Sequence, residues 1–283
     1  MNYPIDMKDQ LGRQFTVAKK PKRIVSLAPA NTEIIYALGA EDRLIGVTEY
    51  CDYPVAAKSK DKVGGYSTVS IKKITSKKPD LILAASIHLK EIIPELEKTG
   101  FTILALEPKS PKEILEAIAL TGKCIGSSKE AYKLILELEE RLKKVRDNIS
   151  TLKEGQKPSV FYIHEHETWK TFGSGTIGDT LTELAGGVNI GREFGDYYPY
   201  PKVKEVIEKN PDVIIVETGY GKNIDEPLDA ALKDERLLGM DARKNGRVYG
   251  VNSDYISRTG PRIVDGLEIL AKILHPKLFS NNK

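Results

Sequence analysis

The chain has 283 residues, with 43 lysine or arginine side chains against 40 aspartate or glutamate, and a formal net charge of +3. This balance, with no basic block interleaved with aromatic residues, excludes a nucleic-acid-binding surface, and no apolar run is long enough to span a membrane. The length allows roughly two domains, each large enough to bury its own core.

The chain contains two cysteines. Cys51 and Cys124 lack metal-ligand spacing and are too few for a disulfide framework. We interpret them as small buried thiols, with a disulfide between them as the alternative.

The first residues, MNYPIDMKDQLG, contain no apolar signal core. The protein is therefore either cytoplasmic or an exported protein from which the signal has been removed.

Strands and helices alternate through the first half of the chain. After a polar stretch with a hairpin around Gly12, the predicted strands are residues 23–27, 44–48, 81–85 and 102–106. The first helix follows the first strand, is capped by Asn31 or Thr32, and ends at Gly39. Further helices are predicted at residues 89–99 and 111–125. This alternation predicts a parallel sheet with helices on both faces.

One short pattern occurs twice, as KITSKKPDLIL at residues 73–83 and as EVIEKNPDVII at residues 205–215. In each copy a short amphipathic helix has to end before Pro79 or Pro211, because proline pushes the preceding residue out of helical geometry. The aliphatic run that follows has the character of a buried parallel strand. The repeat predicts two similar α/β lobes with a ligand cleft between them.

A long helix is predicted between the two copies. Residues 128–149 contain no Pro or Gly, and Ala131, Leu138 and Val145 fall on one face at helical spacing. At about 1.5 Å per residue this rod is roughly 33 Å long. We therefore predict an α/β fold of two similar lobes with mostly parallel sheets joined by a single long α-helix. The N-terminal lobe covers residues 1–126, the connecting helix 127–154 and the C-terminal lobe 155–283.

The second half starts with a predicted strand at residues 159–164 and a glycine-rich turn that leads into a helix at 177–185. The remaining elements, apart from the second copy of the repeat, are a helix at residues 226–232, a strand at 247–251 and a helix at 261–274. The glycines at 173, 175 and 178 have the spacing of a dinucleotide fingerprint, but no strand runs directly into them. We interpret them as a turn that lets a helix pack closely.

The histidines and the catalytic motifs show whether the sequence predicts a metal site or an enzyme. His164 and His166 project from one face of a strand end, and His88 of the first lobe could join them around a metal. Because no Asp or Cys at ligand spacing accompanies them, we expect polar lining and no metal site. The sequence has no G-x-S-x-G elbow, HExxH pair or Walker lysine loop. This absence favours a binding protein over an enzyme.

Tyrosines gather on predicted loops. They are Tyr50, Tyr53 and Tyr66 in the first lobe and Tyr197, Tyr198, Tyr200, Tyr220 and Tyr255 in the second. A tyrosine ring suits a flat, partly polar ligand, and loops at the carboxyl ends of parallel strands are where such folds bind ligands. Before the last helix, Asp254 and Arg258 either hydrogen-bond amide or carboxylate groups of the ligand or form a solvated capping loop.

Five segments together resemble the periplasmic-binding proteins of vitamin B12 and ferric-siderophore ABC importers. They are residues 23–54 and 62–84 and the later LTELAGGVNI, NPDVIIV and SRTGPRIVDGL, and they cover nearly the whole chain in matching order. The segments EYCDYP and VGGY are most similar to cobalamin receptors. The resemblance implies two lobes joined by one helix, no cofactor, a monomer, and a place in the periplasm or, lipid-anchored, outside the membrane.

The resemblance also implies roles for residues. By position, the corrin-contacting aromatics of cobalamin receptors fall on Tyr50, Tyr66 and Tyr200, the last two in place of tryptophans, and their acidic ligand-binding residue falls on Asp254. His88 is a candidate for an axial position on the metal of the ligand. The full predicted ligand-binding set is Tyr50, Tyr66, His88, Trp169, Tyr198, Tyr200, Asp254 and Arg258.

The predicted contacts with the importer depart from the family. Its members usually have a glutamate at the start of each repeated helix, facing arginines of the membrane subunits. The corresponding residues here are Lys72 and Lys204, with Glu205 adjacent. The resemblance thus predicts docking through Lys72, Lys204 and Glu205, either onto acidic pockets or through a contact shifted to Glu205.

Three functional hypotheses follow. The first is an extracytoplasmic solute-binding protein that captures a corrinoid between its lobes and delivers it to an ABC importer. The second keeps the fold and replaces the ligand by a ferric siderophore or haem. The third is a cytoplasmic two-lobed α/β enzyme, which would need the glycine turn or the histidines to be catalytic.

Overall fold

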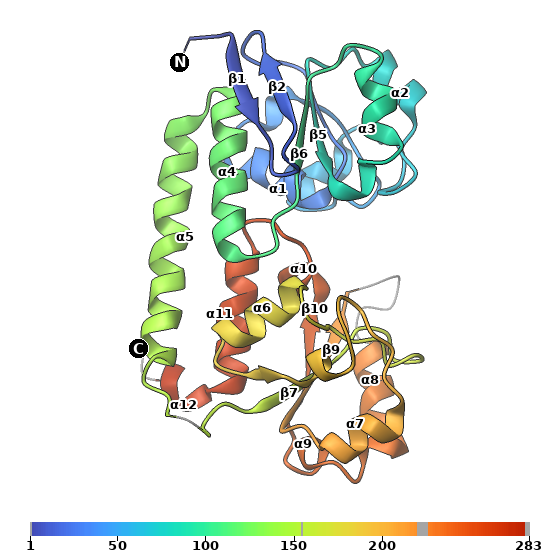
Figure 1. The fold of residues 1–283 in the computed structure, drawn as a ribbon, viewed down its shortest axis with the longest axis vertical. Helices are drawn as coiled ribbons and strands as arrows, with labels where there is room; N and C mark the ends of the chain where they lie inside the picture. Colours follow the sequence, from blue (N-terminus) through green and yellow to red (C-terminus); the bar gives the residue numbers. More distant parts are fainter. Residues whose placement is uncertain (1, 154, 220–225, 281–283) are drawn as a thin grey trace. The chain divides into compact units, whose positions relative to one another are not determined.

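The computed structural model describes residues 2–153, 155–219 and 226–280, and its internal contacts divide the chain into two compact units. Unit 1 holds the residues up to Glu139 together with Thr259–Pro261. Unit 2 holds Glu140–Arg258 and the residues from Arg262 onward. Each unit has its own four-stranded sheet with helices around it (Figure 1).

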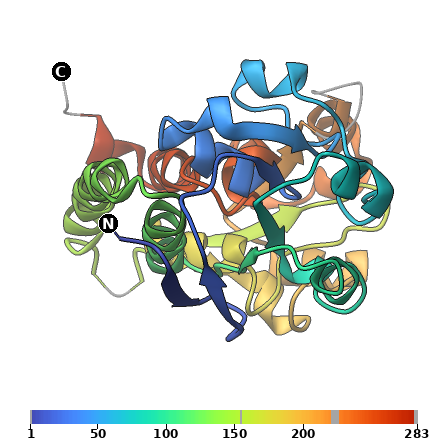
Figure 2. The ribbon, with the colours of Figure 1, turned by 90° about the horizontal axis from the view of Figure 1, so that it is seen from above.

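Unit 1 contains a small hairpin and a parallel sheet. Its strands are β1 (Ile5–Lys8), β2 (Gln14–Val17), β3 (Ile24–Ser26), β4 (Leu44–Val47), β5 (Leu81–Ala85) and β6 (Ile103–Leu106). Its helices are α1 (Pro29–Ala37), α2 (Ile71–Ser76), α3 (Ile92–Glu97), α4 (Pro111–Ile125), the start of α5 (Ser128–Ile149), and the 3₁₀ turns η1 (Glu41–Arg43), η2 (Val55–Ser59) and η3 (Ser86–His88). The predicted hairpin around Gly12 is confirmed: β1 and β2 pair antiparallel, and Figure 2 shows them in dark blue as a separate element.

Unit 2 contains a second parallel sheet. Its strands are β7 (Ser159–Ile163), β8 (Val188–Asn189), β9 (Val213–Thr218) and β10 (Val248–Asn252). Its helices are α6 (Ile177–Leu184), α7 (Val203–Lys209), α8 (Glu226–Lys233), α9 (Asp241–Lys244), α10 (Ser253–Ile256), α11 (Ile263–Leu274), α12 (Pro276–Phe279), and the turns η4 (Ile190–Glu193) and η5 (Glu235–Leu237).

The two main sheets have the same strand order. The order is β4-β3-β5-β6 in unit 1 and β8-β7-β9-β10 in unit 2, and all neighbours are parallel. Counted within each unit, both are 2-1-3-4. The repeated sequence falls at the same place in both, with α2 or α7 leading into the third strand. The prediction of two similar α/β units with parallel sheets is therefore confirmed.

Each sheet is covered by an aliphatic core, as expected for parallel strands buried on both faces. In unit 1 the core contains Val25, Ile82 and Ile103 from neighbouring strands, with α-helical and loop residues packed on them. In unit 2 Phe161 and Ile214 play the same part. The continuous apolar runs of the sequence are therefore explained by two separate hydrophobic cores.

The repeated Pro-Asp turn closes each unit in the same way. The residue before the proline is left-handed in both copies, with φ of 46° at Lys78 and 44° at Asn210, so each helix ends there. The carboxylate of Asp80 accepts hydrogen bonds from the backbone N–H groups of Lys22 and Arg23, at 2.8 to 3.1 Å. Asp212 accepts in the same manner from the backbone and hydroxyl of Ser159, both at 2.7 Å. Each aspartate thus fixes the start of the first strand of its sheet.

The long helix α5 extends over Ser128–Ile149, as the sequence predicts. It begins close to α4, where Gly122 lets the two backbones approach: a Cβ added at Gly122 would lie 2.4 Å from that of Ala131. In unit 2, Arg141 of α5 pairs with Asp265 at 2.5 Å and with Glu268 at 2.8 Å. The boundary between the two units falls inside this helix, after Glu139. The three-part division predicted from the sequence remains a prediction.

The glycine-rich turn before α6 is a close-packing device, as interpreted from the sequence. A Cβ added at Gly173 would lie 2.1 Å from the Gly195 carbonyl oxygen, and one at Gly178 would lie 2.3 Å from the Phe172 ring. The Thr176 hydroxyl caps α6 by accepting from the Asp179 backbone N–H. Backbone and ring occupy the space at these glycines, so packing accounts for them.

Candidate ligand-binding site

The strand order identifies one edge of each sheet as the place where folds of this kind usually bind ligands. In a parallel sheet of order 2-1-3-4, the crossover connections from strands 1 and 3 leave in different directions, which opens a crevice at their carboxyl ends. These strands are β3 and β5 in unit 1 and β7 and β9 in unit 2. The residues that follow them are described below, one unit at a time.

In unit 1 the polar residues at the start of α1 hold the strand ends together. The Asn31 side-chain amide donates to the Ala84 carbonyl at 2.9 Å, and the Thr32 hydroxyl donates to that of Ser26 at 2.8 Å. The predicted capping role of Asn31 or Thr32 is wrong, because α1 starts two residues earlier, at Pro29, with Ala28 as N-cap and no side-chain cap. Both side chains instead tie the start of α1 to β3 and β5.

His88 is a positioning residue for Tyr66. It is fully buried, and its Nδ1 accepts from the Ala85 backbone N–H at 3.0 Å. Since Nδ1 is the acceptor, Nε2 carries the proton and donates to the Tyr66 carbonyl at 2.7 Å. The Tyr66 ring meets the imidazole edge-on, with centroids 5.6 Å apart. Burial lowers the pKa of His88, so the imidazole stays neutral. With both ring nitrogens bonded inside the unit, His88 has no lone pair for a metal in this arrangement, contrary to the expected axial role.

Tyr50 and Tyr66 lie on the same connection, between β4 and α2. Tyr50 is 58% exposed, and its ring lies against Gly65, 3.9 Å from the position of an added Cβ. Gly64 has φ of 123°, and a Cβ there would be 2.7 Å from the Thr68 carbonyl oxygen, so the turn requires glycine. A tight turn therefore places the ring of Tyr50 against the backbone of Gly65, the residue before Tyr66.

In unit 2 three polar side chains meet beyond the sheet. His164 follows β7, and its Nδ1 is bonded to the carboxylate of Glu217 on β9. The Ser257 hydroxyl donates to the other oxygen of the same carboxylate. Glu217 is 1% exposed and His164 is only partly buried. Because Ile163 and Val216 are register partners, the next residues along the two strands, His164 and Glu217, are brought together by the sheet.

A cluster of rings and one cation adjoins this histidine. The ring of Tyr198 lies 5.4 Å from that of His164 and 5.9 Å from that of Phe172, between centroids. The Lys170 ammonium lies 5.5 Å from the centroid of Tyr198 and 5.7 Å from that of Tyr200. Burial acts to lower the pKa of Lys170, but the hydrogen bonds and charges of Glu165 and Tyr200 together outweigh this effect, and the pKa is raised. Lys170 therefore remains a cation over two tyrosine faces.

The tyrosines of unit 2 occupy the connection that corresponds to the one in unit 1. Tyr198 and Tyr200 lie between β8 and α7, as Tyr50 and Tyr66 lie between β4 and α2. Tyr200 is 61% exposed. The second strand and the repeated helix are thus joined in both units by a loop that presents tyrosines. Tyr220, also expected on a ligand-facing loop, lies outside the described residues.

Asp254 and Arg258 form an ion pair on the segment around α10. Arg258 Nε lies 2.8 Å from Asp254, and Arg262 lies 3.3 Å from the other carboxylate oxygen. The Arg262 guanidinium also stacks on Tyr255, 5.4 Å from its centroid. The predicted pair is therefore brought together, and a third residue that the sequence interpretation missed, Arg262, belongs to the same group.

Trp169 is placed differently from the expectation. It is 0% exposed and belongs to the core of unit 2, 6.0 Å from Phe161 between ring centroids and 5.1 Å from the Arg236 guanidinium. An indole with no exposed surface packs the core and has no face to offer a ligand in this arrangement. His166 is bonded to Asp234 at 3.2 Å, a carboxylate whose pKa the hydrogen bond from Arg236 lowers.

The described part of the chain contains metal-ligating side chains and two cysteines. Among the described residues, no group of three or more His, Cys, Asp and Glu side chains is arranged to hold a metal ion. Both cysteines are free and buried, and burial raises the pKa of Cys124 to about 12. No helix within the described ranges is both long and apolar enough to cross a membrane.

The three residues predicted to contact the importer are exposed at the starts of the repeated helices. Lys72 is on α2 and Lys204 and Glu205 are on α7. Lys204 is 86% exposed at its side chain and pairs loosely with Glu208 at 3.7 Å. Glu205 accepts a hydrogen bond from the Lys202 backbone N–H at 3.0 Å and so caps its own helix.

Comparison with known proteins decides the family. Residues 24–255 match the family model described as periplasmic binding protein, which is most of the chain. The chain belongs to the periplasmic binding proteins. This periplasmic binding protein is 30% identical to an uncharacterized ABC transporter substrate-binding lipoprotein of Bacillus subtilis, YvrC, over 98% of this chain and 87% of the relative.

Two further comparisons concern vitamin B12. The vitamin B12-binding protein of Vibrio cholerae is 31% identical over 87% of each chain. The crystal structure of the periplasmic vitamin B12 binding protein of the same species superposes with a TM-score of 0.77 at 29% identity, covering 91% of this chain and 98% of that one. Our periplasmic binding protein thus shares its fold with a receptor of known structure.

Family membership decides the broad function. The protein is the solute-binding component of an ABC importer: it works outside the cytoplasm with the importer's transmembrane subunits and binds a small-molecule ligand. Its relatives bind transported ligands and carry no resident cofactor. The hypothesis of a cytoplasmic enzyme is therefore wrong.

Proposed function

We propose that the ligand of this periplasmic binding protein is a corrinoid, with cobalamin as the compound to test first. The observation that carries the proposal is the matched pair of tyrosine loops, one in each unit at the carboxyl edge of a parallel sheet. Tyr50 and Tyr200, one from each loop, are both more than half exposed. The corrin ring is large, flat and mostly apolar, and exposed aromatic faces are suited to cover it.

The polar groups near the loops support the same ligand. A cobalamin carries amide side chains around its ring, which donate and accept hydrogen bonds. Asp254 and Arg258 supply an acceptor and a set of donors beyond the sheet of unit 2, and His164 adds an imidazole whose orientation is fixed by Glu217. The 31% identity with a protein named as vitamin B12-binding points in the same direction.

In the first experiment cobalamin is titrated into the protein, and the heat of binding is measured by calorimetry. Tyr66→Ala and Tyr200→Ala should each weaken binding roughly tenfold or more, because a stacked ring contributes about 0.5–1.5 kcal/mol beyond the area that it buries. The matched control is Tyr132→Ala, since Tyr132 is a tyrosine on α5 with a similar exposure of 64%. Absence of heat or absorbance change with the wild-type protein would refute the proposal.

Competition separates the ligands of this family. A ferric siderophore or haem, added to the cobalamin-loaded protein, should not displace cobalamin. If either displaces it or binds in its absence more tightly, the ligand is an anionic metal chelate, and Lys170 and Arg258 become the residues that bind its charge.

We also propose that Lys72 and Lys204 contact the importer's membrane subunits. Both start a copy of the repeated helix and both are exposed. Lys72→Glu and Lys204→Glu should reduce ATP hydrolysis by the reconstituted importer and leave ligand binding unchanged. Lys144→Glu is the control, because Lys144 on α5 is also exposed and also pairs with a glutamate one turn away, Glu140. Equal effects of all three variants would exclude a specific role for the two lysines.

A further inference from the structure

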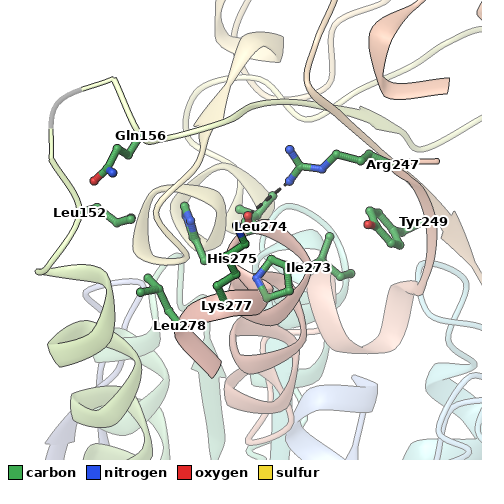
Figure 3. A pocket seen from close by; sticks show the side chains of 10 residues that line it. Leu152, Gln156, Arg247, Tyr249, Ile273, Leu274, His275, Lys277 and Leu278 are labelled. Carbon is green, nitrogen blue, oxygen red and sulfur yellow. Dashed lines mark hydrogen bonds between the residues drawn. The ribbon is translucent and has the colours of Figure 1, made fainter. Parts of the chain in front are cut away.

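A cavity of about 550 Å³ opens within unit 2, away from the tyrosine loop, at the junction of α11 and α12 (Figure 3). Leu152 and Gln156, from the connection between α5 and β7, lie on one side, and Arg247 and Tyr249, at the start of β10, lie on the other. This volume is in the range of pockets that bind small molecules. Neither the family assignment nor the proposed corrinoid site uses it.

Much of the lining is apolar. Leu152, Ile273, Leu274 and Leu278 contribute aliphatic side chains, and Tyr249 adds an aromatic ring. All but Leu274 keep part of their surface exposed. Burial of such a surface by an apolar body would contribute about 25 cal/mol per Å². The lining therefore fits a ligand with an aliphatic or aromatic part.

The charged groups of the lining are cationic. Among the described residues that line the cavity, the only formal charges are those of Arg247 and Lys277. The Arg247 guanidinium donates one hydrogen bond, from Nη2 to the Leu274 carbonyl at 3.3 Å, drawn as a dashed line in Figure 3. No ion pair joins it to another described residue. An arginine has five N–H donors, so this guanidinium has donors left for an anion.

We propose that this cavity binds an amphiphilic anion, a molecule with one carboxylate or phosphate head on an apolar body. The head group bonds to the Arg247 guanidinium, whose planar fork matches both kinds of anion, and Lys277 adds a second positive charge at the rim. The apolar body covers Ile273 and Leu278. A free amphiphilic acid and an anionic membrane lipid share this chemistry.

The test uses the full chain and three small-molecule probes that differ in head group and in apolar body. Decanoate below its critical micelle concentration should bind with one site per chain by calorimetry. Acetate, which has the head without the body, and decyltrimethylammonium, which has the body with the opposite charge, should not bind. Arg247→Gln should weaken decanoate binding roughly tenfold, the effect of losing a hydrogen bond to a charged group. Arg146→Gln, an exposed arginine on α5, should have no effect.

Vesicles distinguish the two sources of the anion. Phosphatidylcholine vesicles with and without phosphatidylglycerol are sedimented with the wild-type protein and with Arg247→Gln. Decanoate binding without vesicle binding assigns the site to free acids, and vesicle binding that needs both phosphatidylglycerol and Arg247 assigns it to a lipid head group. The proposal is overturned if neither probe binds, if decyltrimethylammonium binds as well as decanoate, or if Arg247→Gln retains wild-type binding. A second variant, Leu278→Asp, keeps the test valid if Arg247→Gln fails to fold. It leaves Arg247 in place, removes part of the apolar lining and should also abolish binding.

Discussion

Replacement of His88 by alanine is the sharpest test of how unit 1 holds its tyrosine loop. The imidazole bridges the Ala85 N–H, at the end of β5, and the Tyr66 carbonyl. In His88→Ala both backbone groups lose their partner, and the space of a buried ring is left empty. A buried donor or acceptor without a partner costs about 1–3 kcal/mol. Allowing for partial hydration, we expect the free energy of unfolding to fall by about 2–4 kcal/mol.

The measurement is urea unfolding at pH 7.5, with two comparison variants. His88→Gln can restore one of the two hydrogen bonds and should lose less stability. His166→Ala removes a partly exposed ring with a single side-chain bond to Asp234 and should cost less than about 1 kcal/mol. The reasoning is refuted if His88→Ala is as stable as His166→Ala. If Tyr66 contacts the ligand as proposed, His88→Ala should also weaken ligand binding while Tyr66 itself is unchanged.

The same residue predicts a pH dependence. Burial lowers the pKa of His88 in the folded protein below its ordinary value of 6.5. Below pH 6.5 the unfolded chain therefore binds more protons than the folded one, and stability falls as the pH is lowered towards the folded pKa. The contribution is fully present above pH 6.5. The stability difference between the wild type and His88→Gln should shrink from pH 7.5 to pH 5.5, and a difference that grows on acidification would contradict the lowered pKa of His88.

Other substitutions test the packing of both units. Asp80→Ala and Asp212→Ala should each lower the free energy of unfolding by about 1–2 kcal/mol, since each removes charge-assisted bonds to the start of a strand; a chevron or urea curve that is unchanged for either would show that the turn closes without its carboxylate. Trp169→Ala should cost about 3–5 kcal/mol as a buried aromatic, whereas a loss of ligand affinity at unchanged stability would place the indole in the binding site instead. The Cys124 thiol, with its pKa raised to about 12 by burial, should react with a disulfide reagent at pH 8 only in urea, and rapid labelling of the native protein would show that it is accessible.

Elements with strong local signals could be predicted from the sequence to the residue. The helix α4 has Ser110 as cap and Pro111 at its first position, and it ends at Gly126 in left-handed geometry. Helix α5 has no breaker between its ends. The two Pro-Asp turns predicted both the duplication and the third strand of each sheet. In each of these cases neighbouring residues alone dictate the backbone, so no tertiary contact is needed to place the element.

The features that the sequence did not predict depend on contacts between residues that are distant in the chain. Strand β8 has only two residues and is defined by pairing with β7, so no period marks it. Trp169 belongs to the predicted ligand-binding set, but Phe161 and Arg236 enclose it. Glu217 was missed, although one signal was available. It directly follows the aliphatic run of a predicted parallel strand, and His164 is the last residue of another predicted strand, so adjacency of the two strands would have paired them.

The meeting of Ser257, His164 and Glu217 has a chemical consequence. A serine, a histidine and an acid are the components of a hydrolytic centre, in which the imidazole must take the proton of the hydroxyl. Here the hydroxyl and the imidazole both donate to the carboxylate, so the serine proton is directed at the acid and no base activates the oxygen. If the ligand is a corrinoid, as proposed, its amide groups can therefore lie beside these three residues without being hydrolysed.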